Sequence, residues 1–533
     1  MSSLERKFIK AEVRQRREEG CDVEEIQGRI ASATEGDIDE EKLTSLYDEL
    51  MALPIDSSFS YTEPSTLEEI CAERPDAHRK LELAWDDDKL YDQIYGAWLG
   101  RAAGCALGKP VEGWPKERID KYLGDEDALP LDNYLPYNDK IIPKIHIPST
   151  RDNIQYMDRD DDLDFPILAL LALEHKGAHM TARTMAGTWI SRMPYGCVYT
   201  AEDSAYRNFV MGIRPPESAS YRNPFREWIG AQIRADMFGY VAPGWPERAA
   251  ELAFLDASIS HTKNGIYGEM WVAAMIAAAF VHSNVEDIIE AGLGEIPAKS
   301  RLAEAIRNTL EWCRENEDWE VTWEKISEHY GHYNGVHTIN NAALVVMGLY
   351  YGEKDFETGI VTTVRGGWDT DCTGATVGSI LGIKFGANAL PDKWVGVLND
   401  RLISAVRGEG DNKISDLAAR TLKIAKVIAS APEKQKNATL TGTAGGIWEL
   451  ETGWGEQLLN FTEGTIEFVN DQLGPYPIVT SSYGHPELYF SFGIDKGGWE
   501  FEVDFEGTVN GETLEGHFYP GETPVKGRRI SKD

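Results

Sequence analysis

The sequence lacks the cysteine pairs that a disulfide scaffold or a zinc finger requires. Its 533 residues include six cysteines, which are scattered along the chain without a Cys-x-x-Cys pair. In a chain of this length, isolated cysteines are typical of reduced intracellular thiols. The N-terminal segment also lacks the apolar core of a secretory signal, because charged residues begin at Glu5. We therefore expect a cytoplasmic protein.

Long apolar runs and positive charge are also scarce. The longest apolar run, Met270 to Val281, has about 12 residues, whereas a helix that crosses a membrane needs about 20. Lys and Arg number 53 against 88 Asp and Glu, so the net charge is −35. A polyanion is repelled by nucleic acids and by anionic membranes. We expect neither as a partner, although a small anionic molecule could bind at a local cationic site. The sequence leaves the oligomeric state open.

Apolar residues make up 42% of the chain, enough for a large buried core, and its length predicts two or three domains. Residues 1–75 form an N-terminal extension: residues 1 to about 55 are charged, with apolar positions at helical spacing, and residues from about 56 to 75 are rich in Ser, Pro, Thr and Glu and predict a connector. This N-terminal extension is either a helical hairpin docked on the main body or a partly mobile arm. Residues 76–432 carry helical patterns throughout, including an Ala-rich segment at Met270–Phe280 that predicts a central buried helix.

Residues 433–533 have a different pattern. Apolar and polar residues alternate with period two in several short segments, such as Trp499–Phe505, and Gly, Asn and Asp separate these segments. This pattern predicts a small antiparallel β domain, either a sandwich or an up-and-down barrel. The expected architecture is therefore multidomain, with an all-α domain, an N-terminal helical extension and a small C-terminal all-β domain.

Two acidic segments stand directly before apolar helical patterns. The first is Asp160–Asp162, and the second contains Asp369 and Asp371 between glycines. A single Asp at a helix start is explained by capping of the free backbone amides. Adjacent carboxylates beside a buried helix repel each other, and a cation is the usual remedy. Two such segments together favour a metal site assembled from distant parts of the chain.

The candidate ligands are rich in oxygen. Carboxylates without clustered His or Cys favour Mg²⁺, Ca²⁺ or Mn²⁺ over Zn²⁺. A pair of such ions can hold a water and bind a diol, such as the 2- and 3-hydroxyls of a ribose. An acidic side chain could then transfer a proton to or from the leaving group. Asp161 and Glu112 are the candidates, although a lone acid such as Glu112, in a loop after a helix, is more often a solvated surface residue.

Three stretches in combination resemble the ADP-ribosylglycohydrolase family, and the resemblance covers about residues 88–430. They are GAWLGRAAGCALGKPVEG, DRDDDLDF and GGWDTDCTGATVGSILG, which begin at Gly96, Asp158 and Gly366. The segment Ile229–Arg234 is similar to the family's glycine-rich substrate loop, and Ser260 with His261 resembles its His-bearing helix start. Each stretch alone is a weak signal, but their combination is specific.

The resemblance implies an all-α fold with two divalent cations, usually Mg²⁺ with Mn²⁺ as an alternative, in a central cleft. Glu112 looks like the family's mobile glutamate, which touches a metal and assists catalysis. The implied metal ligands are Asp160, Asp161, Asp162, Asp369, Asp371 and Cys372. The implied substrate-binding residues are Gly230, Ala231, Arg234 and His261. Asp160 and Cys372 stand where the family has Thr, and Ile229 stands where many members have Asn.

The resemblance implies a metal-dependent glycohydrolase that cleaves a bond to ribose in an ADP-ribosylated protein or small molecule. One alternative is a divergent hydrolase of another glycosyl or nucleoside compound on the same scaffold. Another is a non-catalytic sugar- or nucleotide-binding protein, in which aromatic side chains of the β domain form a platform, although such side chains more often fill a β core. The platform candidates are Tyr476, Tyr483, Tyr489, Phe490 and Trp499.

Overall fold

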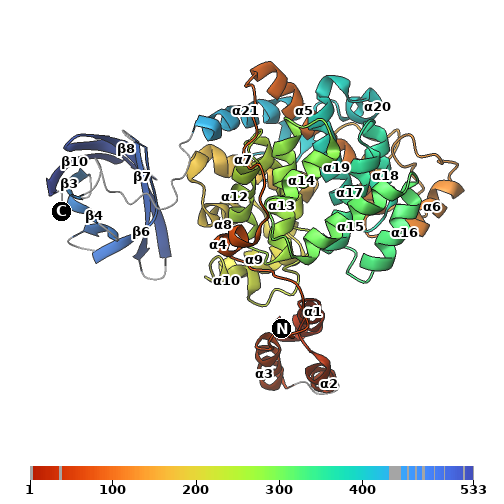
Figure 1. Cartoon of the computed structure of the whole chain (residues 1–533), viewed down its shortest axis with the longest axis horizontal. Helices are drawn as coiled ribbons and strands as arrows, with labels where there is room; N and C mark the ends of the chain where they lie inside the picture. The colour runs from red at the N-terminus through yellow and green to blue at the C-terminus, as the bar shows by residue number, and fades with distance from the viewer. Residues whose placement is uncertain are drawn as a thin grey trace. The chain divides into compact units, whose positions relative to one another are not determined.

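The computed structural model describes residues 4–34, 39–430, 446–452, 455–462, 465–470, 474–484, 487–496, 499–519 and 523–531. The chain forms two compact units, Met1–Ala429 and Ser430–Asp533. The predicted domain boundary at residues 432 and 433 lies outside the described residues. Figure 1 shows the helices of the first unit and the strands of the second.

The first unit is mostly helical, as the sequence predicts. Its α-helices are α1 (Leu4–Glu18), α2 (Glu24–Ala33), α3 (Glu40–Met51), α4 (Leu67–Glu73), α5 (Asp87–Gly108), α6 (Lys116–Asp125), α7 (Asp161–Lys176), α8 (Ala182–Arg192), α9 (Thr200–Val210), α10 (Glu217–Ser220), α11 (Asp236–Tyr240), α12 (Pro246–Ala257), α13 (Asn264–Ala279), α14 (Val285–Leu293), α15 (Arg301–Glu315), α16 (Trp319–Tyr330), α17 (Thr338–Tyr351), α18 (Phe356–Arg365), α19 (Thr370–Phe385), α20 (Asp392–Val395) and α21 (Ile414–Ser430). A short antiparallel pair, β1 (Arg401–Ile403) and β2 (Asp411–Lys413), was not predicted. Within the described residues, none of the helices combines the length and the apolar character needed to cross a bilayer.

Helices α5 and α19 pack so closely that their backbones touch. Glycines of the two helices face each other in antiparallel order: Gly96 and Gly382, Gly100 and Gly378, Gly104 and Gly374. A Cβ atom on Gly104 would lie 1.9 Å from the carbonyl oxygen of Gly374, so this contact requires glycine. The antiparallel order places the carboxyl end of α5 beside the amino end of α19. There the Thr370 hydroxyl donates a hydrogen bond to the Gly108 carbonyl at 2.8 Å.

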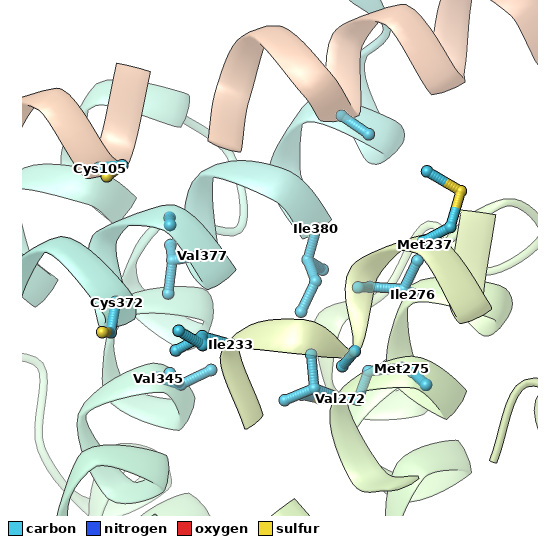
Figure 2. Packing of buried hydrophobic residues seen from close by; sticks show 14 of the residues in the cluster. Cys105, Ile233, Met237, Val272, Met275, Ile276, Val345, Cys372, Val377 and Ile380 are labelled. Carbon is cyan, nitrogen blue, oxygen red and sulfur yellow. The ribbon is translucent and has the colours of Figure 1, made fainter. Parts of the chain in front are cut away.

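Helix α13 is buried along its whole length, which confirms the prediction for the Ala-rich segment. It packs between α12 and α14 (Figure 1). Its side chains meet those of α11, α17 and α19 in the main core (Figure 2), whose labelled members include Met237, Val272, Met275, Ile276, Val345, Val377 and Ile380. This core fixes the helices whose ends carry the two acidic segments.

The N-terminal extension is docked on the helical unit. Its helices α1, α2 and α3 share a small apolar core, and α1 contacts the rest of the unit through buried polar side chains. Arg226 donates hydrogen bonds to Glu12 at 2.7 Å and to Glu19 at 2.9 Å. Gln15 donates to Glu227 at 2.7 Å. Of the two alternatives that the sequence left open, the structure has the docked form, with three helices in place of a hairpin.

The second unit is an up-and-down barrel of antiparallel strands. Each strand pairs with its neighbour in sequence, and the last strand pairs with the first to close the barrel. The strands are β3 (Gly446–Thr452), β4 (Gly455–Thr462), β5 (Thr465–Asn470), β6 (Gly474–Gly484), β7 (Glu487–Lys496), β8 (Trp499–Asn510), β9 (Thr513–Tyr519) and β10 (Thr523–Ser531). Phe490 fills the barrel core and stacks on Phe505 with ring centroids 4.8 Å apart. The side chains of the other platform candidates lie outside the described residues.

Candidate functional site

The first acidic segment lies at the amino end of α7. Asp160 is the N-cap residue, and its Oδ1 accepts a hydrogen bond from the Asp162 backbone amide at 3.1 Å. Asp162 is fully buried, and its Oδ1 accepts a hydrogen bond from Arg101 at 3.0 Å. The other oxygen, Oδ2, has no hydrogen-bond partner among the described residues. Capping therefore explains Asp160 but leaves half of the Asp162 carboxylate unexplained.

The second acidic segment opens α19. Asp369 is the N-cap residue, yet its carboxylate makes no capping hydrogen bond. Aspartates at the other N-caps of the described helices do accept such bonds, namely Asp39, Asp86, Asp160, Asp318 and Asp355. Two residues later, Asp371 is buried, and its Oδ1 has no partner in the described part of the chain. Capping therefore does not explain Asp369, and one buried oxygen of Asp371 is left for another partner.

Glu112 is held next to Asp369 by two backbone hydrogen bonds between their loops. The Gly113 amide donates to the Trp368 carbonyl at 2.8 Å, and the Trp368 amide donates to the Trp114 carbonyl at 3.0 Å. Trp368 has a φ of 64°, a left-handed conformation that bulky residues rarely adopt. The chain is therefore bent tightly just before Asp369, and this bend keeps the two loops in register.

Candidate ligand atoms from α5, the loop after it, α7 and α19 converge in one place. In each of three groups, all the ligand atoms lie within 4.8 Å of one another. The groups are Cys105, Asp160 and Asp162; Asp162, Asp371 and Cys372; and Glu112, Asp369 and Asp371. Asp162 and Asp371 each belong to two groups and so connect all three. Asp161 is half-buried in the first turn of α7 and belongs to none of the groups. We use the name acid centre for Glu112, Asp160, Asp161, Asp162, Asp369 and Asp371.

Burial, with a contribution from neighbouring acids, raises the pKa values of Asp371, Asp369 and Glu112. Burial, followed by Glu112 and Asp369, raises the pKa of Asp371 well above its usual range. Burial raises the pKa of Asp369 to about 6. Glu112 is exposed to solvent. Partial burial of its carboxylate, followed by the charges of Asp369 and Asp160, nevertheless raises its pKa to about 7. Repulsion of this kind is relieved when a cation binds.

Two thiols border the acid centre. Cys105 and Cys372 are buried, and burial together with the nearby aspartates raises the pKa of both well above the usual range. Both therefore remain neutral thiols, which are weak ligands for a hard cation such as Mg²⁺. The donor set that fits a cation is made of carboxylate oxygens.

A second group of buried acids surrounds Arg234. Its guanidinium is 1% exposed and forms ion pairs with Glu202, Asp256 and Glu269. Burial, followed by Asp256, raises the pKa of Glu269 well above its usual range, which favours the neutral form of this carboxyl. We use the name arginine cluster for these four residues. Arg234 was predicted to bind substrate, and a direct contact with substrate would require this cluster to open.

The other predicted substrate-binding residues lie around the arginine cluster. His261 is fully buried, and its Nδ1 shares a hydrogen bond with the Ser260 hydroxyl at 2.8 Å. Burial, followed by the charge of Arg234, lowers its pKa well below the usual range, so the imidazole is neutral. Gly230 lies against Glu202, because a Cβ atom there would be 2.1 Å from that carboxylate. Ala231 is buried beside it.

Arg101 connects the predicted substrate loop to the acid centre. It is fully buried in α5, and Nη2 donates to Asp162 Oδ1 at 3.0 Å and to the carbonyl of Ile233 at 2.6 Å. Its Nη1 donates to Asp236 at 2.7 Å. Because Nη2 donates to both the loop and Asp162, a movement of the loop would also move the donor that holds the Asp162 carboxylate.

Comparison with known proteins shows which family the chain belongs to. A model described as ADP-ribosylglycohydrolase matches residues 86–431, which is more than half of the chain. The chain belongs to the ADP-ribosylglycohydrolase family. An uncharacterized protein of Archaeoglobus fulgidus is 28% identical over 314 residues, which cover 57% of this chain and 90% of that relative. A solved structure described as an ADP-ribosylglycohydrolase-related protein complex is 16% identical, with a TM-score of 0.42, and covers 64% of this chain and 99% of that chain.

The ADP-ribosylglycohydrolase region contains every residue of the acid centre. The structure brings five of the six predicted metal ligands into the three groups together with Glu112, and Asp161 is the exception. As ligands, all six remain predictions. Sequence reasoning missed Cys105, Arg101 and Lys109, which contact or border the same carboxylates. The available signal was their position in the glycine-rich stretch of α5 and the turn after it, at the end that meets α19.

Proposed function

We propose that this ADP-ribosylglycohydrolase family member cleaves a glycosidic bond to ribose, in an ADP-ribosylated or related ribosyl compound, with Mg²⁺ or Mn²⁺ in the acid centre. The observation that carries the proposal is the pair of buried oxygens without partners, Asp162 Oδ2 and Asp371 Oδ1. The two aspartates come from distant segments and belong to one group of candidate ligand residues. A buried carboxylate oxygen left unpaired costs free energy, and a bound cation removes that cost.

The residues that would hold the cation are Glu112, Asp162, Asp369 and Asp371. Their oxygens are the donors that Mg²⁺ and Mn²⁺ prefer, and the neutral thiol of Cys372 lies beside them as a weaker donor. A cation bound there would supply Lewis acidity and a fixed positive charge that orients two neighbouring ribose hydroxyls. Arg101 donates a hydrogen bond to Oδ1 of Asp162 and so fixes the orientation of the carboxylate, including its free oxygen Oδ2.

Glu112 is the proposed proton-transfer residue. Its side chain is exposed beside the buried carboxylates. In the metal-free protein, partial burial followed by Asp369 and Asp160 raises its pKa to about 7. From this position Glu112 could accept a proton from the water that attacks the anomeric carbon or donate one to the leaving group. Asp161 is the second candidate for the activation of water. It stands between Asp160 and Asp162, and burial followed by these two neighbours raises its pKa well above the usual range.

The proposal is tested by the release of free ADP-ribose from ADP-ribosylated arginine and serine peptides, with and without Mg²⁺. Glu112→Gln should lower turnover by about 10²–10⁴-fold, the usual contribution of acid–base catalysis. Its melting temperature should stay close to that of the wild type, because Glu112 is an exposed loop residue. Glu117→Gln is the matched control, since Glu117 is an exposed acid a few residues further along the chain and lies outside the three groups.

The substrate and the chemistry can fail separately in this assay. Cleavage of another ribosyl or glycosyl compound, with neither peptide cleaved, would keep the hydrolase proposal and change the substrate. If the metal-loaded protein cleaves no glycosidic bond, the hydrolase proposal is wrong, and the non-catalytic binding protein becomes the leading alternative.

A further inference from the structure

Lys109 reaches the acid centre from the turn that follows α5. It begins the short 3₁₀ helix Lys109–Val111, is 8% exposed, and is followed by the rigid Pro110. Its ammonium lies 3.3 Å from Asp158 Oδ2 and 3.3 Å from Asp160 Oδ2, and it donates to the carbonyl of Arg159. The three donors of the ammonium thus have three oxygen acceptors.

These contacts leave Asp160 without an unused oxygen. Its Oδ1 accepts the capping hydrogen bond from Asp162, and its Oδ2 pairs with Lys109. Asp162 Oδ2 and Asp371 Oδ1, in contrast, are buried with no partner in the described part of the chain, and Asp369 makes no capping bond. Among the described residues, Lys109 has no ion pair with Asp162, Asp369 or Asp371, so it leaves these carboxylates to another cation.

We propose that the Lys109 ammonium acts as a built-in cation at Asp160, so that the acid centre binds a single divalent ion where the resemblance implies two. The ion would lie among Glu112, Asp162, Asp369 and Asp371. This inference rests on the proposed metal dependence and specifies its stoichiometry. The physical reason is that a fixed positive charge already neutralises Asp160, and a divalent cation placed at the same carboxylate would be repelled by the ammonium.

Charge at the centre agrees with this assignment. Arg101 pairs with Asp162 and Lys109 pairs with Asp160, so two aspartates of the centre already have a protein cation. Asp369, Asp371 and Glu112 have no ion pair with Lys, Arg or His among the described residues. Asp371 belongs both to the group with Asp162 and to the group with Glu112 and Asp369, so one divalent ion beside Asp371 would be near carboxylates of both groups.

The test is the number of Mn²⁺ ions bound by the full-length chain, measured by calorimetric titration of metal-free protein, together with the electron paramagnetic resonance spectrum of the loaded protein. The wild type should bind one Mn²⁺ and give the spectrum of an isolated ion. Lys109→Met keeps the apolar stem and removes the charge, so it should bind a second Mn²⁺ and give the spectrum of an exchange-coupled pair. Lys109→Arg keeps the charge and should bind one ion.

Lys116→Met is the matched control. Lys116 is 9% exposed, lies in the same stretch of chain, and pairs with Asp120 and Glu320 outside the acid centre. This variant should bind one ion, as the wild type does. Circular dichroism checks that each variant is folded. The number of Mn²⁺ ions bound by the wild type tests the proposal even if a variant does not fold.

The outcomes separate this inference from the proposed function. Two ions in the wild type would overturn the role of Lys109 and leave metal-dependent hydrolysis intact. One ion in both the wild type and a folded Lys109→Met variant would show that the lysine does not exclude a second ion, and would also overturn the inference. No saturable binding in the wild type would instead overturn the proposed metal dependence.

Discussion

The acid centre and the arginine cluster both contain buried carboxylates, and the helical unit neutralises the two groups differently. In the arginine cluster, the guanidinium of Arg234 is surrounded by Glu202, Asp256 and Glu269, so the cation stands in the middle of the acids. In the acid centre, Arg101 and Lys109 stand at the edge, and each contacts one aspartate of the centre. The acids of the arginine cluster are thus paired within the chain, whereas Glu112, Asp369 and Asp371 of the acid centre have no ion pair with Lys, Arg or His among the described residues.

Both groups contain buried oxygens without partners, so the number of unsatisfied atoms does not distinguish them. Asp256 Oδ1 and Glu269 Oε1 lack partners in the arginine cluster, as Asp162 Oδ2 and Asp371 Oδ1 do in the acid centre. The difference is that three or more candidate ligands converge only in the acid centre, among the residues that the structure describes. A proton on Glu269 suffices for the first group, and a divalent cation fits the second.

The largest effect is expected from removal of the central cation of the arginine cluster. Arg234→Met leaves three buried acids without their partner and should lower the free energy of unfolding by about 3–5 kcal/mol. Chemical denaturation with tryptophan fluorescence measures this. Arg420→Met, which removes ion pairs with Glu174 and Glu409 near the surface, is the control and should cost no more than about 1 kcal/mol. Equal costs for the two variants would show that Arg234 does not hold its cluster together.

A second variant tests whether the acid centre depends on the contact of α5 with α19. Gly104→Ala places a Cβ atom 1.9 Å from the Gly374 carbonyl oxygen. The free energy of unfolding should fall by about 3 kcal/mol, because the backbone must move to make room for this atom. Mn²⁺ affinity should fall as well, since the shift separates Asp162 from Asp371. Gly187→Ala in α8 is the control, because a Cβ atom there would have no atom within 4 Å. Its free energy of unfolding should rise by up to about 1 kcal/mol, since Ala has a higher helix propensity than Gly. Unchanged Mn²⁺ affinity in Gly104→Ala would separate the helix contact from the site.

How much of the site the sequence predicts can be judged from these residues. The sequence predicted that Asp160–Asp162 and Asp369 with Asp371 form one site, since paired acids before apolar helices have a local signature. The structure confirmed the predicted all-α domain, the N-terminal helices and the small β domain. The pairing of Lys109 with Asp160 and the docking of Arg226 on Glu12 had no such signature, because they join segments through tertiary contacts that spacing does not encode. The same holds for Arg234, whose three acid partners come from separate helices.

Asp371→Asn sharpens the comparison from the side of the acid centre. The variant removes one buried charge that its neighbours repel, so the metal-free protein should melt at a higher temperature than the wild type. It also removes a shared ligand, and Mn²⁺ affinity should fall by about 100-fold or more. Differential scanning calorimetry with and without Mn²⁺ measures both effects. A lower melting temperature without metal would mean that Asp371 has a structural partner that its free oxygen does not reveal.

The smallest effect is expected from Glu269→Gln in the arginine cluster. Since burial and Asp256 raise the pKa of Glu269 and so favour its neutral form, an amide of the same shape should change the free energy of unfolding by less than about 1 kcal/mol. Chemical denaturation at neutral pH compares it with the wild type. A loss similar to that of Arg234→Met would show that Glu269 is ionised and that this cluster needs the full charge of three acids.

The most direct test of the central claim, that the acid centre binds a divalent cation, is anomalous diffraction at the manganese absorption edge from crystals grown with Mn²⁺. We predict an anomalous peak within coordinating distance of Asp162 Oδ2 and Asp371 Oδ1, with Glu112 or Asp369 as a further ligand. Asp160 should remain paired with Lys109. A map with no peak at these oxygens, from crystals that hold Mn²⁺ at saturating concentration, would contradict the account.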